Sequence, residues 1–247
     1  MLTRLFLISV TLLFSASSYA KHFVVGVERI QYLPQYTHDA GEYGGFARQF
    51  LDMWAKDNNH TVEYKILPIS RLFKELLKPN SELDFKYPDN SYWQQDMKKG
   101  KNVTYSDAVV DYIDGVVVTP GNMGKGKQAL KKLGTARGFT AWDYLGDIKS
   151  KAITVKENNS FAGLLKQVIS GRVDGAYINI AVARYHLANQ LKQPGAVVFD
   201  PNLPHTKSAY HLSTIKHPKV LEDFNKWMKK NQGDVAALKQ KWGVNAM

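Results

Sequence analysis

The stretch from Leu83 to Thr119 constrains the fold more than any other part of the chain. It begins with a short apolar segment that stops at Pro88, and proline fixes φ and has no N–H to donate to a strand ladder. A polar turn and two aromatic residues follow, and a β-branched run from Ile113 to Thr119 closes the stretch. This order predicts a buried strand, a polar turn at its carboxyl end, and a second strand that leaves for another part of the molecule.

Strand-like and helix-like patterns alternate through the rest of the chain, which is typical of α/β proteins. Apolar or alternating segments predict strands at Phe23–Val27 and Thr61–Leu67. Between them, Phe46–Ala55 places large apolar side chains at helical spacing and predicts a helix. The flexible stretch 120–127 marks the natural domain boundary. It has the glycine spacing of a phosphate-binding loop, but Gln128 stands where that motif needs Ser or Thr, so we interpret it as a linker.

Residues 1–20 have the pattern of a cleaved signal peptide. Arg4 supplies a positive start, residues 5–14 are apolar, and Ser18-Tyr19-Ala20 is a small-x-small cleavage sequence. The apolar segment is too short to span a bilayer, and no cysteine follows it to carry a lipid. An anchor helix is the alternative, but the polar residues 15–18 come too soon after the apolar segment. We therefore expect an exported protein without a lipid anchor.

Composition argues against several functional classes. The chain has 33 Lys and Arg against 22 Asp and Glu, a balance that nucleic-acid-binding proteins can share. The basic residues are scattered over the predicted helices, however, so we expect a solvated surface and no nucleic-acid partner. There is no cysteine, and the 7 histidines lack metal-ligand spacing, so no metal or cofactor is expected. No nucleophile motif is present, and we assign no catalytic residue.

A series of short motifs, taken in chain order, resembles the type 2 periplasmic solute-binding proteins that supply polar amino acids to ABC importers (bacterial extracellular solute-binding protein family 3). Asp84 matches the Asp of a family strand that leads into a ligand-contacting loop, Tyr105-Ser106-Asp107 resembles the phrase that follows in the family, and Asp114–Val118 resembles the strand that crosses to the second lobe. Gly171–Asn179 is the strongest match, and the end Leu238–Gly243 also fits. The resemblance covers nearly the whole chain after residue 20.

The resemblance implies an α/β, two-lobed periplasmic binding protein-like II fold whose lobes are joined by two crossing hinge strands. Lobe 1 is expected to comprise residues 21–118 plus 213–247, and lobe 2 residues 119–212. We expect Val24–Val27 and Asp84–Lys86 to be parallel strands of one sheet, and Ala176–Ile178 to lie in the separate sheet of the other lobe.

The resemblance also implies a ligand site in the cleft between the lobes, formed by strand ends and the loops after them. Gly138 and Thr140 match the family's element that offers backbone N–H groups to an anion. Asn179 matches the polar position that touches ligand. The expected ligand-contacting residues are Glu28, Tyr32, Arg71, Asp89, Asn90, Trp93, Ser106, Gly138, Phe139, Thr140, Tyr177 and Asn179.

The chain departs from the family's amino-acid binders in two respects. They carry Asp at the position of Asn179, where it pairs with the ligand's ammonium group, and Asn cannot supply that charge. The arginine that grips the ligand's carboxylate is missing from the stretch 93–96, and only Arg71, Lys86 or Lys98 are available as substitutes. Because aromatic residues are abundant, we expect binding through aromatic stacking and neutral hydrogen bonds more than through an ion-pair clamp.

We therefore expect a monomeric periplasmic protein that captures a small polar solute, an amino acid or a related compound, and delivers it to the membrane permease of an ABC importer. Two alternatives stay open. One is a periplasmic, dehydratase-like enzyme on the same scaffold, with Glu28 or Asp89 as acid or base, favoured by a buried carboxylate without a charge partner. The other is a sensory or adaptor module, which would lack a well-lined cleft.

Overall fold

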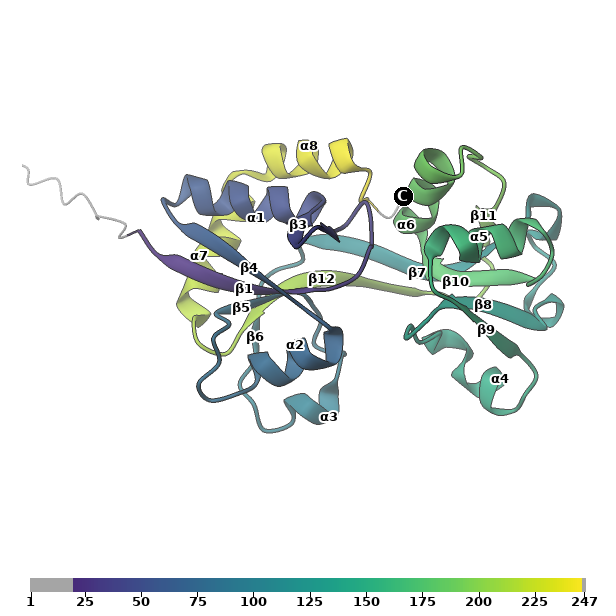
Figure 1. The fold of residues 1–247 in the computed structure, drawn as a ribbon, viewed down its shortest axis with the longest axis horizontal. Coiled ribbons are helices and arrows are strands. Elements are labelled where there is room, and N and C mark those ends of the chain that lie inside the picture. Colours follow the sequence, from purple (N-terminus) through teal and green to yellow (C-terminus); the bar gives the residue numbers. More distant parts are fainter. Residues whose placement is uncertain (1–19, 246–247) are drawn as a thin grey trace, which may run out of the picture.

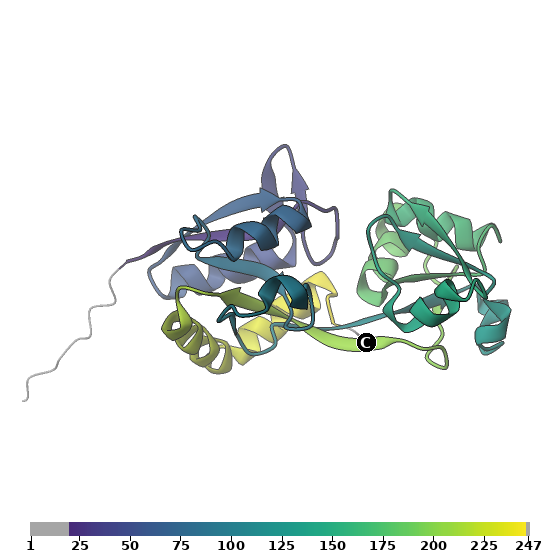
Figure 2. The same cartoon turned by 90° about the horizontal axis from the view of Figure 1, so that it is seen from below.

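The computed structural model describes residues 20–245, and the predicted signal peptide at residues 1–20 therefore lies outside the described residues except for Ala20. The described part of the chain forms two α/β lobes that lie side by side and are joined by two long strands (Figure 1). Figure 2 shows the same arrangement from below, with the connecting strands passing toward one side of the molecule. The residue limits given above for each lobe remain a prediction.

Lobe 1 contains the N-terminal strands and both C-terminal helices. Its elements are β1 (His22–Glu28), β2 (Thr37–Asp39), β3 (Glu42–Gly44), α1 (Phe46–Asp57), β4 (Thr61–Leu67), α2 (Ile69–Leu76), β5 (Phe85–Asp89), α3 (Gln95–Lys98), β6 (Thr104–Tyr105), α7 (Pro218–Lys230) and α8 (Gln232–Trp242). The predicted strand at Thr61–Leu67 and the predicted helix from Phe46 are confirmed, and the helix continues two residues past Ala55. Figure 1 shows α1 and α8 on one side of the strands, and α2 and α3 on the other.

Lobe 2 is built from the middle of the chain. Its elements are β8 (Lys132–Ala136), α4 (Leu145–Lys149), β9 (Thr154–Asn158), α5 (Phe161–Ile169), β10 (Gly175–Asn179), α6 (Ile180–Tyr185) and β11 (Val198–Phe199), with 3-10 turns at Pro120–Asn122, Lys127–Ala129 and Trp142–Tyr144 and a π-helical turn at His186–Gln190. After the loop that carries Gly138 and Thr140, a 3-10 turn begins at Trp142 and leads into the short α4.

The two connecting strands are β7 (Val110–Val118) and β12 (Thr206–Thr214), which pair with each other antiparallel. The strand order is β4-β1-β5-β12-β7-β10-β8-β9. The parallel pairing of β1 with β5 is confirmed, with Val25 opposite Phe85. The expected end of this strand at Pro88 is wrong, because β5 begins at Phe85 and continues through Pro88 to Asp89. The expectation of a separate sheet for Ala176–Ile178 is wrong in one respect. Because β12 pairs with β5 in lobe 1 and β7 pairs with β10 in lobe 2, the ladder of paired strands continues from one lobe into the other.

Strands β5 and β10 are buried along their whole length, as expected for parallel strands covered on both faces. In lobe 1 the covering layer is aromatic. The ring of Phe85 lies 5.2 Å from that of Phe23, and Trp54 of α1 lies 5.3 Å from Phe224 of α7. Such edge-to-face pairs contribute about 0.5–1.5 kcal/mol each beyond the burial of their area. This packing makes lobe 1 a rigid support for the residues at the carboxyl end of β1.

Gly45 fixes the loop that follows β1 against the start of α1. Its φ of 88° and ψ of −169° lie in a region that is essentially restricted to glycine. A Cβ there would lie 2.7 Å from Cα of Tyr36 and 3.0 Å from the carbonyl oxygen of Gln35. The first N–H groups of α1 donate to the same loop, Phe46 to Pro34 and Ala47 to Gln35. The loop that carries Tyr32 and Tyr36 is therefore held by backbone contacts.

We expect Gly45→Ala to lower the free energy of unfolding by about 3 kcal/mol, because it combines backbone strain with a clash against the loop. Gly41→Ala is the matched control: Gly41 has the same φ of 88°, but its added Cβ would meet nothing within 4 Å. In that variant the free energy of unfolding should fall by only about 1 kcal/mol. Urea unfolding of both variants measures the difference, and equal losses would show that the contact with Tyr36 is not what requires glycine at position 45.

Candidate functional site

A cavity of about 460 Å³ lies between the lobes, and both connecting strands contribute to its wall. We refer to it as the inter-lobe cavity. Its lining residues come from the carboxyl ends of β1 and β10, from the loops after β1, β5 and β8, and from α2, α3, β7 and β12. They are Glu28, Tyr32, Tyr36, Ile69, Phe73, Tyr92, Trp93, Gln94, Gln95, Asp96, Asp114, Gly138, Phe139, Thr140, Trp142, Tyr177, Ile178, Asn179 and Tyr210. The carboxyl ends of strands are where open α/β sheets usually bind ligands.

A second, larger hollow of about 910 Å³ lies at the opposite end of lobe 1, among α1, α7 and the start of β1. Its lining residues, from Lys21 to Asp234, all belong to lobe 1. It lies at the amino ends of the strands, away from the point where the lobes meet. The inter-lobe cavity is therefore the candidate functional site.

Aromatic side chains form most of the cavity wall. Tyr32 of lobe 1 contacts lobe 2, with its ring 5.7 Å from Phe139 and 5.4 Å from Phe161. On the opposite wall Trp93 lies 6.0 Å from Tyr210 of β12. Tyr92 and Trp142 also line the cavity but are largely exposed to solvent. Flat rings of this kind can stack on a ligand and exclude water from it.

Asp114 is the carboxylate placed deepest among the connecting strands. It lies on β7, and its backbone is paired with Asn179 of β10 on one side and with Thr206 of β12 on the other. Its Oδ1 atom is buried and has no hydrogen-bond partner among residues 20–245. Burial raises the pKa of Asp114 to about 7; a side-chain hydrogen bond from Asn179 works against this rise, and the nearby carboxylate of Asp143 adds to it.

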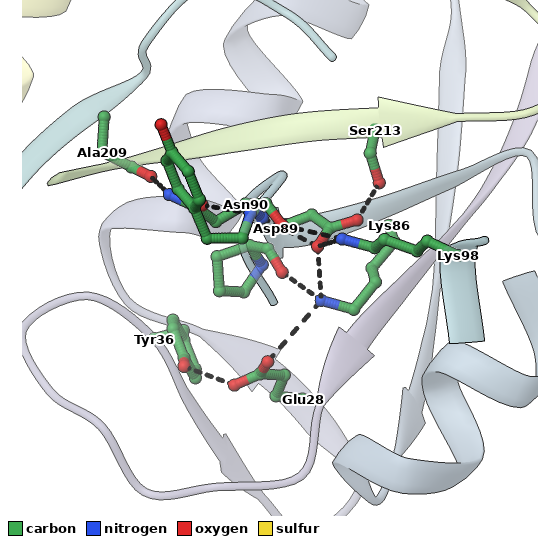
Figure 3. A network of polar contacts seen from close by, with 10 residues as sticks. Glu28, Tyr36, Lys86, Asp89, Asn90, Lys98, Ala209 and Ser213 are labelled. Carbon is green, nitrogen blue, oxygen red and sulfur yellow. Dashed lines mark hydrogen bonds and ion pairs between the residues drawn. The ribbon is translucent and has the colours of Figure 1, made fainter. Parts of the chain in front are cut away.

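Behind the lobe 1 wall lies a buried network of two acids and two bases, shown in Figure 3. Lys86 Nζ lies 3.7 Å from Glu28 Oε1 and 3.8 Å from Asp89 Oδ1, and it donates to the carbonyl oxygen of Pro88. Lys98 Nζ donates to Asp89 Oδ1 at 2.9 Å. The charges of the four side chains balance within the network, as buried charges require.

Two hydroxyl groups complete the network at its ends (Figure 3). Tyr36 donates to Glu28 Oε2 at 2.7 Å, and Ser213 donates to Asp89 Oδ2 at 2.6 Å. Burial raises the pKa of Glu28, while Lys86 and the Tyr36 hydroxyl act to lower it. Burial likewise lowers the pKa of Lys98, and the carboxylate of Asp89 opposes that shift. Glu28 is thus the one charged member of the network that also lines the inter-lobe cavity.

Asn179 is held in a fixed orientation at the floor of the cavity. Its Oδ1 atom accepts from the backbone N–H groups of Ala181 and Val182, so the side chain caps α6. Its Nδ2 atom donates to the hydroxyl of Tyr210 at 3.3 Å. An aspartate could cap the helix equally well, but it would bring a second carboxylate next to Asp114, and two neighbouring carboxylates repel each other. With the neutral Asn179 at this position, Asp114 is the carboxylate of the pair that these two residues form across β10 and β7.

The structure brings together most of the residues predicted from the sequence to contact ligand. Those that line the inter-lobe cavity are Glu28, Tyr32, Trp93, Gly138, Phe139, Thr140, Tyr177 and Asn179. Whether they contact a ligand stays a prediction. The lining also includes residues that the sequence does not single out, among them Tyr36, Phe73, Asp114 and Tyr210. The sequence places Asp114 only in the crossing strand, because its position opposite Asn179 depends on strand register.

Four of the predicted ligand-contacting residues lie outside the lining. Arg71 is exposed on α2, whose buried side chains point to the sheet. Asp89 is fully buried in the charge network. Asn90 donates to Ser208 Oγ and to the carbonyl oxygen of Ala209, which fastens the turn after β5 to β12. Ser106 also bonds β12, because its hydroxyl accepts from the N–H of Leu212.

Comparisons with known proteins establish the fold. No protein-family model matches the sequence, and no curated protein matches it. Among solved structures, an ancestral arginine-binding protein bound to arginine is 24% identical, with a TM-score of 0.65 and coverage of 90% of this chain and 97% of that one. The ancestral amino-acid-binding protein AncCDT-1, described as a precursor of cyclohexadienyl dehydratase, is 22% identical, with a TM-score of 0.65 and coverage of 90% and 94%.

The second substrate-binding domain of GlnP from Lactococcus lactis, in an open conformation, is 14% identical, with a TM-score of 0.60 and coverage of 90% and 94%. These likenesses extend over nearly the whole described chain and confirm the predicted two-lobed fold of type 2 periplasmic binding proteins. None of the helices in the described part of the chain has the length and apolar character needed to cross a bilayer.

Proposed function

We propose that the protein captures a small polar solute in the inter-lobe cavity and presents it to the membrane permease of an ABC importer. The observation that carries this proposal is the composition of the cavity wall, which takes residues from both lobes and from both connecting strands. A solute held there contacts both lobes at once only when they are close together. It therefore shifts the equilibrium between open and closed arrangements, which is the signal a permease can detect.

The proposed function also implies where the protein acts and in which oligomeric state. We place the mature protein in the periplasm as a monomer, after removal of residues 1–20 and without a lipid anchor. The similarity to a substrate-binding domain of GlnP supports the importer role, because the two chains match over most of their length. The well-lined cavity argues against an adaptor that binds no ligand.

The proposal predicts that at least one small solute raises the melting temperature of the protein, since a ligand that binds only the folded state stabilises it by mass action. A thermal-shift screen of amino acids, amines, sugars and small carboxylates is the measurement. Trp93→Ala should weaken the best binder about tenfold or more, because it removes a wall of the cavity. Arg71→Ala is the control and should change the affinity less than about twofold, because Arg71 is exposed outside the lining.

The opposite result would contradict the placement of the site. If Arg71→Ala abolished binding while Trp93→Ala left it unchanged, the solute would be held by a carboxylate clamp on α2 and not by the inter-lobe cavity. If no solute in the screen raised the melting temperature, the proposed function would fail.

A specific observation favours a second candidate, a dehydratase-like enzyme. Asp114 lines the cavity with a pKa of about 7, which suits a general acid or base, and AncCDT-1 is described as a precursor of a dehydratase. Asp89 does not fit that role, because it is fully buried and bonded to Lys98 and Ser213. Incubating each binder with the protein and following it by proton NMR separates the candidates. A solute converted by the protein, and left intact by Asp114→Asn, would favour the enzyme.

A further inference from the structure

The charges that face the inter-lobe cavity are all of one sign. Three carboxylates line it, those of Glu28, Asp96 and Asp114, and no Lys, Arg or His within residues 20–245 does so. Glu28 already has Lys86 as a partner, and Asp96 lies on the exposed helix α3. Asp114 is different, because no ion pair joins it to a basic side chain within the described residues, and the charged group that acts on its pKa is another carboxylate, Asp143, which raises it. Asp114 is thus the lining carboxylate that is largely shielded from solvent and yet lacks a counter-charge in the described part of the chain.

The three basic residues considered as substitutes for a carboxylate clamp do not reach the cavity. Arg71 points into solvent from α2. The side chain of Lys86 is 0% exposed, and its ammonium group is held by Glu28, Asp89 and the carbonyl oxygen of Pro88. Lys98 donates to Asp89 and to the carbonyl oxygen of Asn90. Among the described residues, a solute carboxylate in this cavity would therefore find negative groups and aromatic faces, and no cationic side chain.

We propose that the solute is an organic cation without a carboxylate group, an amine, guanidine or quaternary ammonium compound, whose charge pairs with Asp114 on the connecting strand β7. Its positive group supplies the counter-charge that the Asp114 carboxylate lacks among the described residues, where its Oδ1 atom has no hydrogen-bond partner. The surrounding rings, including Tyr32, Trp93 and Tyr210, attract a cation through their π faces. This inference rests on the proposed function, and it revises the sequence-based expectation that an ion pair contributes little to binding.

The groups around Asp114 determine how binding depends on pH. The charged or titratable side chains that interact with it come from the loop after β1, from β7, β10 and β12, and from the turn before α4. They are Tyr32, Tyr112, Tyr177, Tyr210 and Asp143. The pKa of each tyrosine is raised by burial, so these phenols stay neutral near neutral pH. Asp114, whose pKa is raised to about 7, takes up or releases a proton in this range.

The experiment compares pairs of compounds that differ mainly in a carboxylate: agmatine with arginine, cadaverine with lysine, putrescine with ornithine, and choline with glycine betaine. Isothermal titration at about pH 8 should show, in at least one pair, the compound without the carboxylate binding about tenfold tighter or more. Asp114→Asn should weaken that compound about 30-fold or more. Asp111→Asn, which alters an exposed carboxylate on the same strand but outside the lining, should change its affinity less than about threefold.

Lowering the pH provides a second readout on the intact protein. A cation binds the ionised form of Asp114, so its affinity should fall about tenfold between about pH 8 and about pH 6 in wild type and stay level in Asp114→Asn. Tighter binding of the carboxylate-bearing member in every pair, or binding of neither member of any pair, would overturn the inference. In the first case the proposed function would still stand, because a solute binds. In the second case a sugar or another neutral solute that raised the melting temperature would leave the proposed function standing, and the absence of any binder would remove both proposals.

Discussion

Replacing Lys86 by Met is expected to lower the free energy of unfolding by about 3–5 kcal/mol. Lys86 is the buried cation that lies between Glu28 and Asp89, at 3.7 Å and 3.8 Å from their carboxylates. Methionine fills a similar volume but leaves Glu28 in a buried site without its charge partner. Removing one member of a buried ion pair is costly for this reason, even where the intact pair adds little stability. Urea unfolding followed by tryptophan fluorescence measures the loss.

The loss should depend on pH in a defined direction. Burial already raises the pKa of Glu28, and the removal of Lys86 raises it further. A carboxyl whose folded-state pKa lies above its unfolded value stabilises the fold at low pH and loses that contribution as the pH rises through the folded pKa. The destabilisation by Lys86→Met should therefore be smaller at about pH 5 than at about pH 7.

Two further variants separate this effect from general damage. Lys226→Met removes an exposed ion pair with Asp223 and should change stability by less than about 0.5 kcal/mol. The double variant Lys86→Met, Glu28→Gln should be more stable than Lys86→Met alone by about 1 kcal/mol or more, because it also removes the uncompensated charge. A loss below about 1 kcal/mol in Lys86→Met would mean that water reaches the network and that the charges are not buried as a group.

The sequence predicts the elements of this fold better than their connections. Strands such as Thr61–Leu67 and the helix from Phe46 follow from local patterns of apolar residues and breakers. The continuous pairing of strands through β12 and β7 does not follow from local patterns, because these two strands are separated in the chain by the whole of lobe 2. From the sequence we therefore expect a separate sheet in each lobe, whereas the pairing of β12 with β7 joins the strands of the two lobes into one ladder.

The candidate site shows the same limit. Polar residues after predicted strands are reasonable ligand contacts, and Glu28 and Asn179 do line the cavity. Asn90 and Ser106 follow the same rule but instead bond β12, which returns to lobe 1 about a hundred residues later in the chain. The side chain of Asp114 gains its importance from Asn179 opposite it on β10, and register between distant strands is not visible in either segment alone.

Replacing Asp114 by Asn is expected to stabilise the ligand-free protein at about pH 8, by an amount that can reach about 4 kcal/mol. The pKa of Asp114 rises from 3.8 to about 7 on folding, and each tenfold change in proton affinity corresponds to about 1.4 kcal/mol. Because the folded-state pKa is the higher one, wild type loses stability as the pH rises from about 4 to about 7, and the variant does not. Urea unfolding at about pH 5 and about pH 8 should show the gap between the two proteins widening with pH.

Asp96→Asn is the matched control for this prediction, because Asp96 lines the same cavity but lies exposed on α3, and its replacement should leave stability within about 0.5 kcal/mol at both pH values. An Asp114→Asn variant less stable than wild type at about pH 8 would contradict this prediction, since it would show that the carboxylate has a favourable partner in the free protein.

The expected gain in stability together with the expected loss of cation binding has one physical explanation. A partly buried carboxylate without a basic partner among the described residues destabilises the empty protein, and a cationic solute removes that cost when it binds. The charge at position 114 therefore contributes to affinity at the expense of the unliganded fold.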